Sequence, residues 1–265
     1  MPKLLYKNAN IHYSDQGKGP VLVFIHGFLE DLSMWKNIVK NLQISHRVIC
    51  IDLLGHGGTD NIGYIHTMED QAQMLNYLLE KLKVPKCVLI GHSMGGYVAL
   101  SFAELFPEMV KGICLMNSTA LADTEEKKHN RDRGIKAVKH NHKIFIRLAI
   151  PNLFSEENRS VFTSEIKDIT ETALKMSVQG IVAALEGMKV RKDLSHLLGK
   201  KKFSTLMIIG RKDPALDYQS LIDQVDKNTL DHVVFDDGHM SHIENESELK
   251  QELSKWNPIL KGLSS

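Results

Sequence analysis

The chain has 265 residues, of which 43% are hydrophobic and 25% are charged, and its formal net charge is +1. This length suits one large domain with a substantial core, and the near-neutral charge provides no general attraction to nucleic acid or to anionic membranes. No apolar run approaches the roughly 20 residues of a membrane-spanning helix, and the polar N-terminus lacks the apolar stretch of a secretory signal. We therefore expect a cytoplasmic globular protein.

Six short apolar runs are predicted to be strands, and they cover residues 21–26, 47–53, 87–91, 112–117, 205–210 and 232–237. The runs are continuous and β-branched rather than alternating, which is typical of strands covered on both faces in a parallel sheet. Residues 4–17, before the first run, indicate two short strands joined by a turn at an antiparallel edge.

Residues that are mostly apolar recur at helical spacing between several of these runs. One such set is Met68, Gln71, Ala72, Leu75, Leu78, Leu79 and Leu82, and another is Leu249, Leu253, Trp256 and Leu260. Alternating strands and helices predict an α/β doubly wound sheet. Ligands of such sheets bind outside the carboxyl ends of the strands, so the residues that follow each strand are the candidates for function.

One long segment, residues 120–202, interrupts this alternation. It is helix-like and rich in charge, and it contains no run that reads as a buried strand. We interpret it as a helical insertion between two parts of one core, residues 1–119 and 203–265. Its apolar residues either line a pocket or pack the insertion onto the core: Phe145, Ile146, Leu148, Ile150, Leu153 and Phe154.

A basic run from Lys127 to Lys143 lies in the same segment, with seven Lys or Arg residues and one Asp. It indicates either a solvated helix face or an attraction for anionic substrates.

The three cysteines, Cys50, Cys87 and Cys114, all lie in predicted strands. An odd number of thiols inside strands is not a disulfide framework, so we expect buried free thiols and a reducing compartment.

The stretch GHSMGG, residues 91–96, follows a predicted strand and precedes a helical pattern. It matches G-x-S-x-G in the context of a nucleophile elbow, where a serine lies at the tip of a strained turn. Side chains at positions 91 and 95 would collide with the crossing backbone, so small residues are needed there. The sequence therefore predicts Ser93 as a nucleophile.

A serine nucleophile needs a base, and the base needs an acid that orients it. His239 follows the last predicted strand and is the candidate base, with His242 as its rival. Asp213 follows the fifth strand and is the candidate acid. Its rival Asp217 reads better as a helix N-cap. The order Ser93, Asp213, His239 is the order expected for this elbow.

An oxyanion hole would complete the site. The backbone amides of Phe28, after the first strand, and of Met94, after the serine, are the predicted donors. We interpret His26 as a structural residue that holds this loop in place.

Five motifs together resemble the α/β-hydrolase superfamily: FIHGF, DLLGHGGTD, GHSMGG, GRKDP and DDGHMSHIE, in this order between about residues 21 and 245. The resemblance implies a mostly parallel eight-stranded sheet with helices on both faces and a helical cap, here residues 120–202. The end of the cap is similar to that of carboxylesterases and enol-lactone hydrolases. Haloalkane dehalogenases and epoxide hydrolases carry an aspartate at the position of Ser93, which argues against both.

The resemblance implies acyl transfer on a small-molecule carboxylic ester, lactone or thioester, without a cofactor or a metal. Two alternatives stay open. The first is another carbonyl chemistry on the same triad, either C–C cleavage or an elimination of the menaquinone-pathway type. The second is a binding protein of the same fold that does not catalyse.

Overall fold

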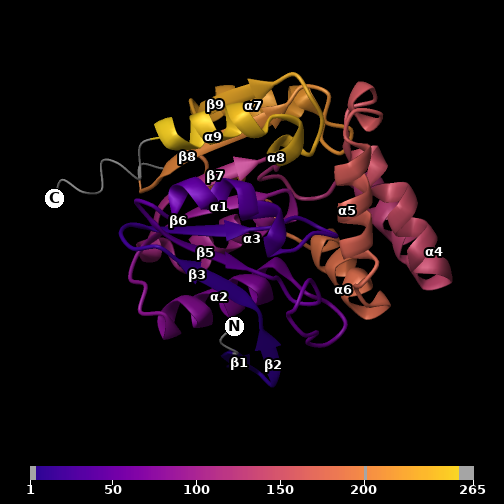
Figure 1. Cartoon of the computed structure of the whole chain (residues 1–265), viewed down its shortest axis with the longest axis horizontal. Coiled ribbons are helices and arrows are strands. Elements are labelled where there is room, and N and C mark those ends of the chain that lie inside the picture. Colours follow the sequence, from indigo (N-terminus) through magenta and orange to yellow (C-terminus); the bar gives the residue numbers. More distant parts are fainter. Residues whose placement is uncertain (1–3, 200–201, 257–265) are drawn as a thin grey trace.

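The computed structural model describes residues 4–199 and 202–256. A single large sheet contains β3 (Tyr13–Gln16), β4 (Val21–Ile25), β5 (Arg47–Ile51), β6 (Cys87–His92), β7 (Val110–Met116), β8 (Ser204–Gly210) and β9 (Asp231–Phe235). The order across the sheet is β3-β5-β4-β6-β7-β8-β9 (Figure 1). All neighbours pair in parallel except β3, which is antiparallel to β5. The six predicted strands and the mostly parallel sheet are thus confirmed.

The predicted count of eight strands in this sheet is wrong, because seven strands form it within the described residues. The two further strands, β1 (Leu4–Tyr6) and β2 (Ala9–Ile11), pair only with each other, around a tight turn in which Lys7 and Asn8 have φ values of 45° and 67°. The outer edge of β2 is taken by a loop, since the amide of Asn10 donates to the side chain of Asp60. This edge is therefore closed to the large sheet.

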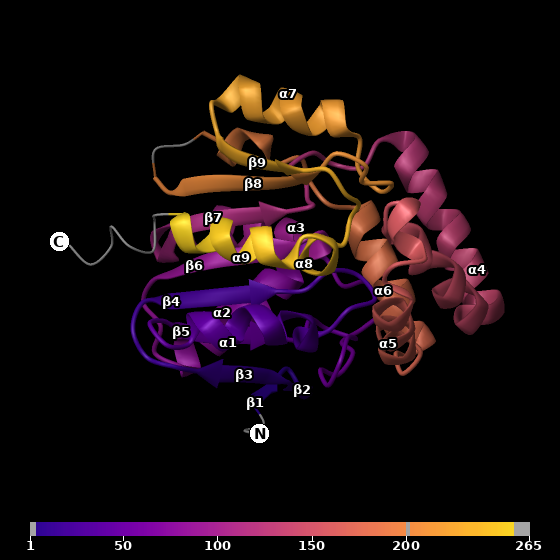
Figure 2. The ribbon, with the colours of Figure 1, turned by 45° about the horizontal axis from the view of Figure 1, so that its top comes forward.

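Helices cover both faces of the sheet (Figure 2). One face carries α1 (Lys36–Leu42) and α9 (Glu246–Lys255), and the other carries α2 (Met68–Lys81), α3 (Met94–Leu105) and α7 (Tyr218–Asn228). Alternate residues of β4 show the division, because Leu22 and Phe24 pack with one helical layer and Val23 and Ile25 with the other. Burial on both faces explains why the strand runs are continuously apolar. The expected helical residue Leu260 lies outside the described residues.

Helices are the only regular secondary structure in the described residues between β7 and β8. They are α4 (Glu125–Ala149), α5 (Thr163–Ala173), α6 (Val178–Lys189) and the short 3₁₀ helices η3 (Pro151–Leu153), η4 (Glu157–Arg159) and η5 (Ser195–Leu197). Figure 1 shows α4, α5 and α6 beyond the carboxyl ends of the parallel strands. We refer to this segment as the cap, and its boundaries at residues 120 and 202 stay a prediction.

Three short helices complete the described elements: η1 (Leu32–Trp35), η2 (Pro107–Met109) and α8 (Ser241–Glu244). Helix α4 itself has a break at Asn141, where the backbone is not helical. At the break, Asn141 Oδ1 accepts a hydrogen bond of 3.1 Å from the amide of Ile144. Across the described ranges, every helix is too short or too polar to traverse a bilayer.

The three cysteines are buried free thiols, as predicted. Burial raises the pKa of both Cys50 and Cys87 to about 12, so neither thiol is a ready nucleophile.

The cap helix α6 lies directly against the loop before α2. The amide of His66 in that loop donates to the carbonyl of Ala183 over 2.9 Å. A Cβ atom at Gly187 would overlap the carbonyl oxygen of His66. The absence of a side chain at Gly187 therefore allows the helix and the loop to approach this closely.

Replacing Gly187 by Ala should destabilise the protein, although alanine is the better helix former. Helix propensity alone would raise the free energy of unfolding by about 1 kcal/mol, whereas overpacking against a backbone carbonyl costs about 1–3 kcal/mol. We expect a net loss, measured by urea unfolding. Gly134→Ala in α4 is the matched control, because its Cβ would meet atoms no closer than 3.7 Å, and it should be neutral or stabilising. Equal effects of both variants would contradict the contact.

Candidate active site

Ser93 lies at the corner between β6 and α3, with φ of 49° and ψ of −115°. A positive φ is strained for a residue with a side chain, and such strain costs about 1–3 kcal/mol. The two glycines expected to relieve crowding do so, because a Cβ at Gly91 would overlap Gly95 and a Cβ at Gly95 would overlap the carbonyl of Ile25. Ser93 itself is partly exposed, while His92 and Met94 are buried.

Asp213 and His239 come from the loops that follow β8 and β9, and the structure brings them together. His239 Nδ1 lies 2.7 Å from Asp213 Oδ2, and both side chains are buried. The other oxygen, Asp213 Oδ1, accepts the amides of Ala215 and Leu216 at 2.8 and 3.1 Å. Burial raises the pKa of Asp213. His239 and these hydrogen bonds lower it by more than burial raises it, so the pKa lies below its usual value. The carboxylate is thus held ionised beside the imidazole.

Asn117 also holds Asp213, and the sequence reasoning missed it. It follows β7 with φ of 45°, and its Nδ2 donates to Asp213 Oδ2 at 3.2 Å and to the carbonyl of Gly238 at 3.1 Å. It therefore joins the acid to the loop that carries His239. The available signal was its position as a polar residue directly after a strand.

The two alternative candidates, Asp217 and His242, and the structural residue His26 do not join Ser93, Asp213 and His239. Asp217 caps α7 by accepting the amide of Ser220, as predicted. The ring of His26 donates to the carbonyl of Gly27 and accepts the amide of Leu53, which matches its predicted structural role. His242 lies in α8, where burial lowers its pKa to about 4, so it is neutral at pH 7.

A cavity of about 660 Å³ connects the predicted residues, since Ser93, His239 and Phe28 all line it. Its remaining wall is largely apolar, with Tyr97, Phe145, Ala149, Leu153, Leu185, Met188 and Leu216. Of the six apolar cap residues considered for this role, Phe145 and Leu153 line the cavity. Ile146, Ile150 and Phe154 are buried in packing, and Leu148 is 64% exposed.

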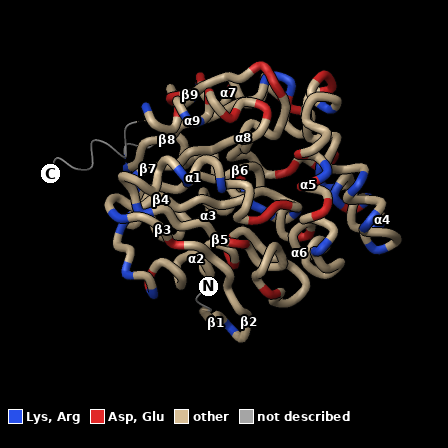
Figure 3. The backbone as a smooth tube through the Cα atoms, viewed as in Figure 1, with Lys and Arg blue, Asp and Glu red and all other residues tan. Residues whose placement is uncertain are grey.

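The basic run of the cap divides between the cavity and the solvent. Lys127 and Arg131 line the cavity together with Glu126, whereas most of the other Lys and Arg residues of the run are exposed. Figure 3 shows basic positions along the tube of α4. Arg131 and Arg191 share the single carboxylate of Asp123. Lys127 forms no ion pair with any described residue. The rim of the cavity therefore carries excess positive charge.

Glu30 and His92 form a buried ion pair behind Ser93, which sequence reasoning also missed. Glu30 Oε2 accepts the amide of Gly27 at 2.7 Å and His92 Nδ1–H at 2.8 Å, and His92 Nε2–H donates to the carbonyl of His239 at 2.9 Å. Burial opposes both charges, but each partner stabilises the other. The pKa of Glu30 falls to about 2 and that of His92 rises. The pair thereby ties together the loops of Gly27, Ser93 and His239.

One group of described residues has metal-ligating atoms that all lie within 4.8 Å of one another. It consists of Glu30, His92 and His242. Because both ring nitrogens of His92 donate hydrogen bonds, this imidazole has no lone pair for a metal. His239, three residues before His242, does not belong to this group, because it is hydrogen-bonded to Asp213. Glu30 and His92 therefore fit a hydrogen-bonded ion pair better than a metal centre.

Known proteins share this architecture. The α/β hydrolase fold family matches residues 20–246. A thermophilic esterase from Thermogutta terrifontis, solved with malate bound, superposes with a TM-score of 0.88 at 31% identity, over 94% of this chain and 93% of that one.

Two further comparisons extend this picture. The enol-lactonase from Burkholderia xenovorans LB400 has the same fold, with a TM-score of 0.87 at 22% identity over 96% of this chain and 98% of that one. The 2-hydroxy-6-oxononadienedioate/2-hydroxy-6-oxononatrienedioate hydrolase 1 of Pseudomonas putida is 28% identical over 223 residues, which are 78% of this chain and 76% of that protein. The extent of the family match, the sheet and its helical layers all agree: this chain belongs to the α/β-hydrolase fold family.

Proposed function

We propose that this protein is a serine hydrolase that cleaves a carboxylic ester, including lactones and thioesters, through Ser93, His239 and Asp213. The observation that carries the proposal is one arrangement. A strained, partly exposed serine at the elbow of β6 and α3 lines the same cavity as a histidine that is hydrogen-bonded to a buried carboxylate. The likeness to an esterase at 31% identity over almost the whole chain supports it.

In the proposed first half-reaction, Ser93 Oγ attacks the carbonyl carbon while His239 Nε2 takes the hydroxyl proton. The carbonyl oxygen becomes an oxyanion, and the amides of Phe28 and Met94 donate hydrogen bonds to it. Met94 is the first residue of α3, where amides have no partner inside the helix. A Cβ at Gly27 would lie 3.2 Å from Ser93 Cβ, so the loop of Phe28 passes directly beside the nucleophile.

Collapse of this intermediate breaks the bond to the alkoxide, which leaves with the proton from His239, and Ser93 holds the acyl group. In the second half, water gives a proton to His239 and attacks the acyl carbon. Ser93 then leaves with that proton, and the carboxylic acid is released. Asp213 stays ionised and stabilises the imidazolium in both halves.

The direct test is hydrolysis of p-nitrophenyl esters with acyl chains from C2 to C12 by the wild-type protein and by Ser93→Ala. The proposal requires turnover that depends on Ser93, and the preferred chain length measures the apolar cavity. Inactivity of both proteins towards every ester would overturn it.

Cleavage of a C–C bond beside a carbonyl is the second candidate function. It is favoured by the relative named for hydrolysis of a dienedioate, which is a dicarboxylate, together with Lys127 and Arg131 at the rim of the cavity. Turnover of 2-hydroxy-6-oxodienoates with no turnover of esters would establish this alternative.

Under either function, Lys127 should favour substrates that carry a carboxylate away from the reacting carbonyl. Lys127→Met is expected to lower kcat/KM for mono-p-nitrophenyl succinate by about 2- to 5-fold, since a partly exposed ion pair contributes up to about 1 kcal/mol. The same variant should leave p-nitrophenyl butyrate unaffected. Lys128→Met is the matched control, because Lys128 pairs with Glu125 at 2.8 Å and does not line the cavity. Equal losses for both esters would exclude charge recognition by Lys127.

A further inference from the structure

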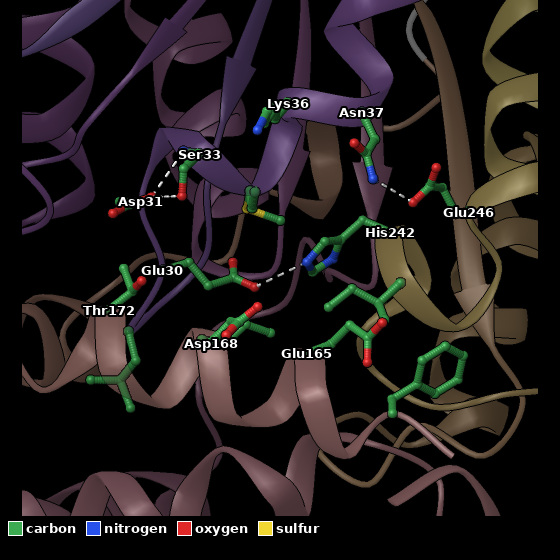
Figure 4. A pocket seen from close by; sticks show the side chains of 15 residues that line it. Glu30, Asp31, Ser33, Lys36, Asn37, Glu165, Asp168, Thr172, His242 and Glu246 are labelled. Carbon is green, nitrogen blue, oxygen red and sulfur yellow. Dashed lines mark hydrogen bonds and ion pairs between the residues drawn. The ribbon is translucent and has the colours of Figure 1, made fainter.

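A second cavity, of about 360 Å³, lies on the other side of Leu29 and Glu30 from the cavity that contains Ser93, and these two residues line both. It opens between the core and the cap. Residues of η1 and α1 form one wall, α5 forms the second, and α8 with the start of α9 forms the third (Figure 4). None of the residues proposed for catalysis lines it.

Carboxylates outnumber cations in this second cavity. It is lined by the carboxylates of Glu30, Asp31, Glu165, Asp168 and Glu246 and by one cation, Lys36. Three of these carboxylates have partners elsewhere, because Glu30 pairs with His92, Asp31 caps η1, and Glu246 binds Asn37 and Lys250. Glu165 and Asp168 have no ion pair with any described residue, and Figure 4 shows both on the side of α5 that faces Glu30 and His242.

Two buried polar atoms of residues that line the cavity have no hydrogen-bond partner. Unpartnered buried atoms are not a general feature of an acidic surface, so they distinguish this cavity. Glu30 Oε2 is occupied by Gly27 and His92, but Glu30 Oε1 has no partner within the described residues. Its nearest charged neighbour is His242 Nε2 at 3.9 Å, beyond hydrogen-bond range. His242 Nδ1 is also unpartnered. Glu30 and His242 are only 4% and 5% exposed, and no described partner offsets the cost of burying these two atoms.

The remaining surface of the cavity selects among cations. Met34, Ile169 and Ile243 supply apolar surface to the cavity beside its carboxylates. A small inorganic ion would leave this surface uncovered, whereas an alkyl chain would cover it. A ligand with a positive N–H donor at each end and methylenes between them matches both features.

We propose that this second cavity binds an alkylammonium group, best a short α,ω-diamine, with one ammonium on Glu30 Oε1 and the other between Glu165 and Asp168. The inner ammonium donates to the orphaned carboxylate oxygen and to the neutral ring of His242. The outer ammonium is partly solvated at the rim. The site does not depend on the proposed function, since binding can be measured without any substrate.

The test is isothermal titration of the full chain with 1,4-diaminobutane at pH 7.5 and low salt. We expect saturable binding of one diamine per chain that weakens as salt is added. The uncharged isostere 1,4-butanediol should not bind. Nα-acetyl-lysine amide should bind as well if the site takes a lysine side chain, and should not if it takes only a free diamine.

Two double variants locate the site. Glu165→Gln with Asp168→Asn should raise the Kd for the diamine by about 10-fold, because charge-assisted hydrogen bonds are roughly twice as strong as neutral ones. Glu156→Gln with Glu171→Gln removes the same charge from exposed positions outside the cavity and should change the Kd by less than about 2-fold. Equal Kd values for the two variants would overturn the proposal. So would the absence of saturable diamine binding, or saturation by Mg²⁺ or Zn²⁺ alone.

Discussion

Ser93→Ala should lower kcat for p-nitrophenyl butyrate by at least about 10⁴-fold, because the neighbouring hydroxyl of Ser118 donates to the carbonyl of Ser93 and does not line the cavity with His239. Removal of a triad nucleophile leaves only the contribution of the oxyanion hole and of substrate binding. The fold should be retained, and relief of the strained φ of 49° is not expected from alanine, which keeps the Cβ. The measurement is steady-state kinetics, with thermal unfolding as the check on folding.

Ser160→Ala is the control for this substitution. Ser160 is exposed and its hydroxyl only donates to the carbonyl of Glu157 at 3.4 Å, so the variant should keep the wild-type rate. A fluorophosphonate should label the wild-type protein at Ser93 and leave Ser93→Ala unlabelled. A folded Ser93→Ala protein that keeps more than a tenth of the wild-type rate would refute the role of Ser93.

Asp213→Asn should reduce kcat by about 10⁴-fold, the loss found for the equivalent change in a serine protease triad. The geometry explains why an isosteric change is so costly. Oδ1 of residue 213 faces two N–H groups, from Ala215 and Leu216, so the oxygen of the new amide must stay there. Its NH₂ group then faces His239 Nδ1, which is forced to accept. The proton moves to Nε2, and His239 can no longer take a proton from Ser93.

Asp217→Asn is the matched control for Asp213→Asn. Asp217 caps α7 through the amide of Ser220 at 2.8 Å, and asparagine is an equally good N-cap. We therefore expect unchanged kcat and an unchanged unfolding temperature. If the two variants lost activity to the same small extent, the orienting role of Asp213 would be wrong.

The sequence predicted those parts of the molecule that depend on local patterns. The strands are visible because both their faces are buried, and Ser93 is visible because the elbow needs glycines on both sides. The closeness of His239 to Asp213 was predictable as well, since the carboxyl ends of parallel strands meet at one edge.

Residues that matter only through a distant partner were missed. Glu30 and His92 are 62 positions apart, and Asn117 and Asp213 are 96 apart. His92 and Asn117 are polar residues at strand ends, Glu30 lies in the loop after β4, and nothing in the neighbourhood of any of the three identifies its partner. The strand count failed for a related reason, because the hairpin of β1 and β2 shows its turn in the sequence but not which sheet edge it meets.

Leu29 and Glu30 form the wall between the two cavities, and this wall also determines whether a small molecule can pass from one to the other. It is one loop thick, and it is the same loop that presents the amide of Phe28. Leu29 and Glu30 therefore form a partition between a chamber lined by α4 and a chamber lined by α5. A molecule held in one chamber is separated by a single loop from a molecule held in the other.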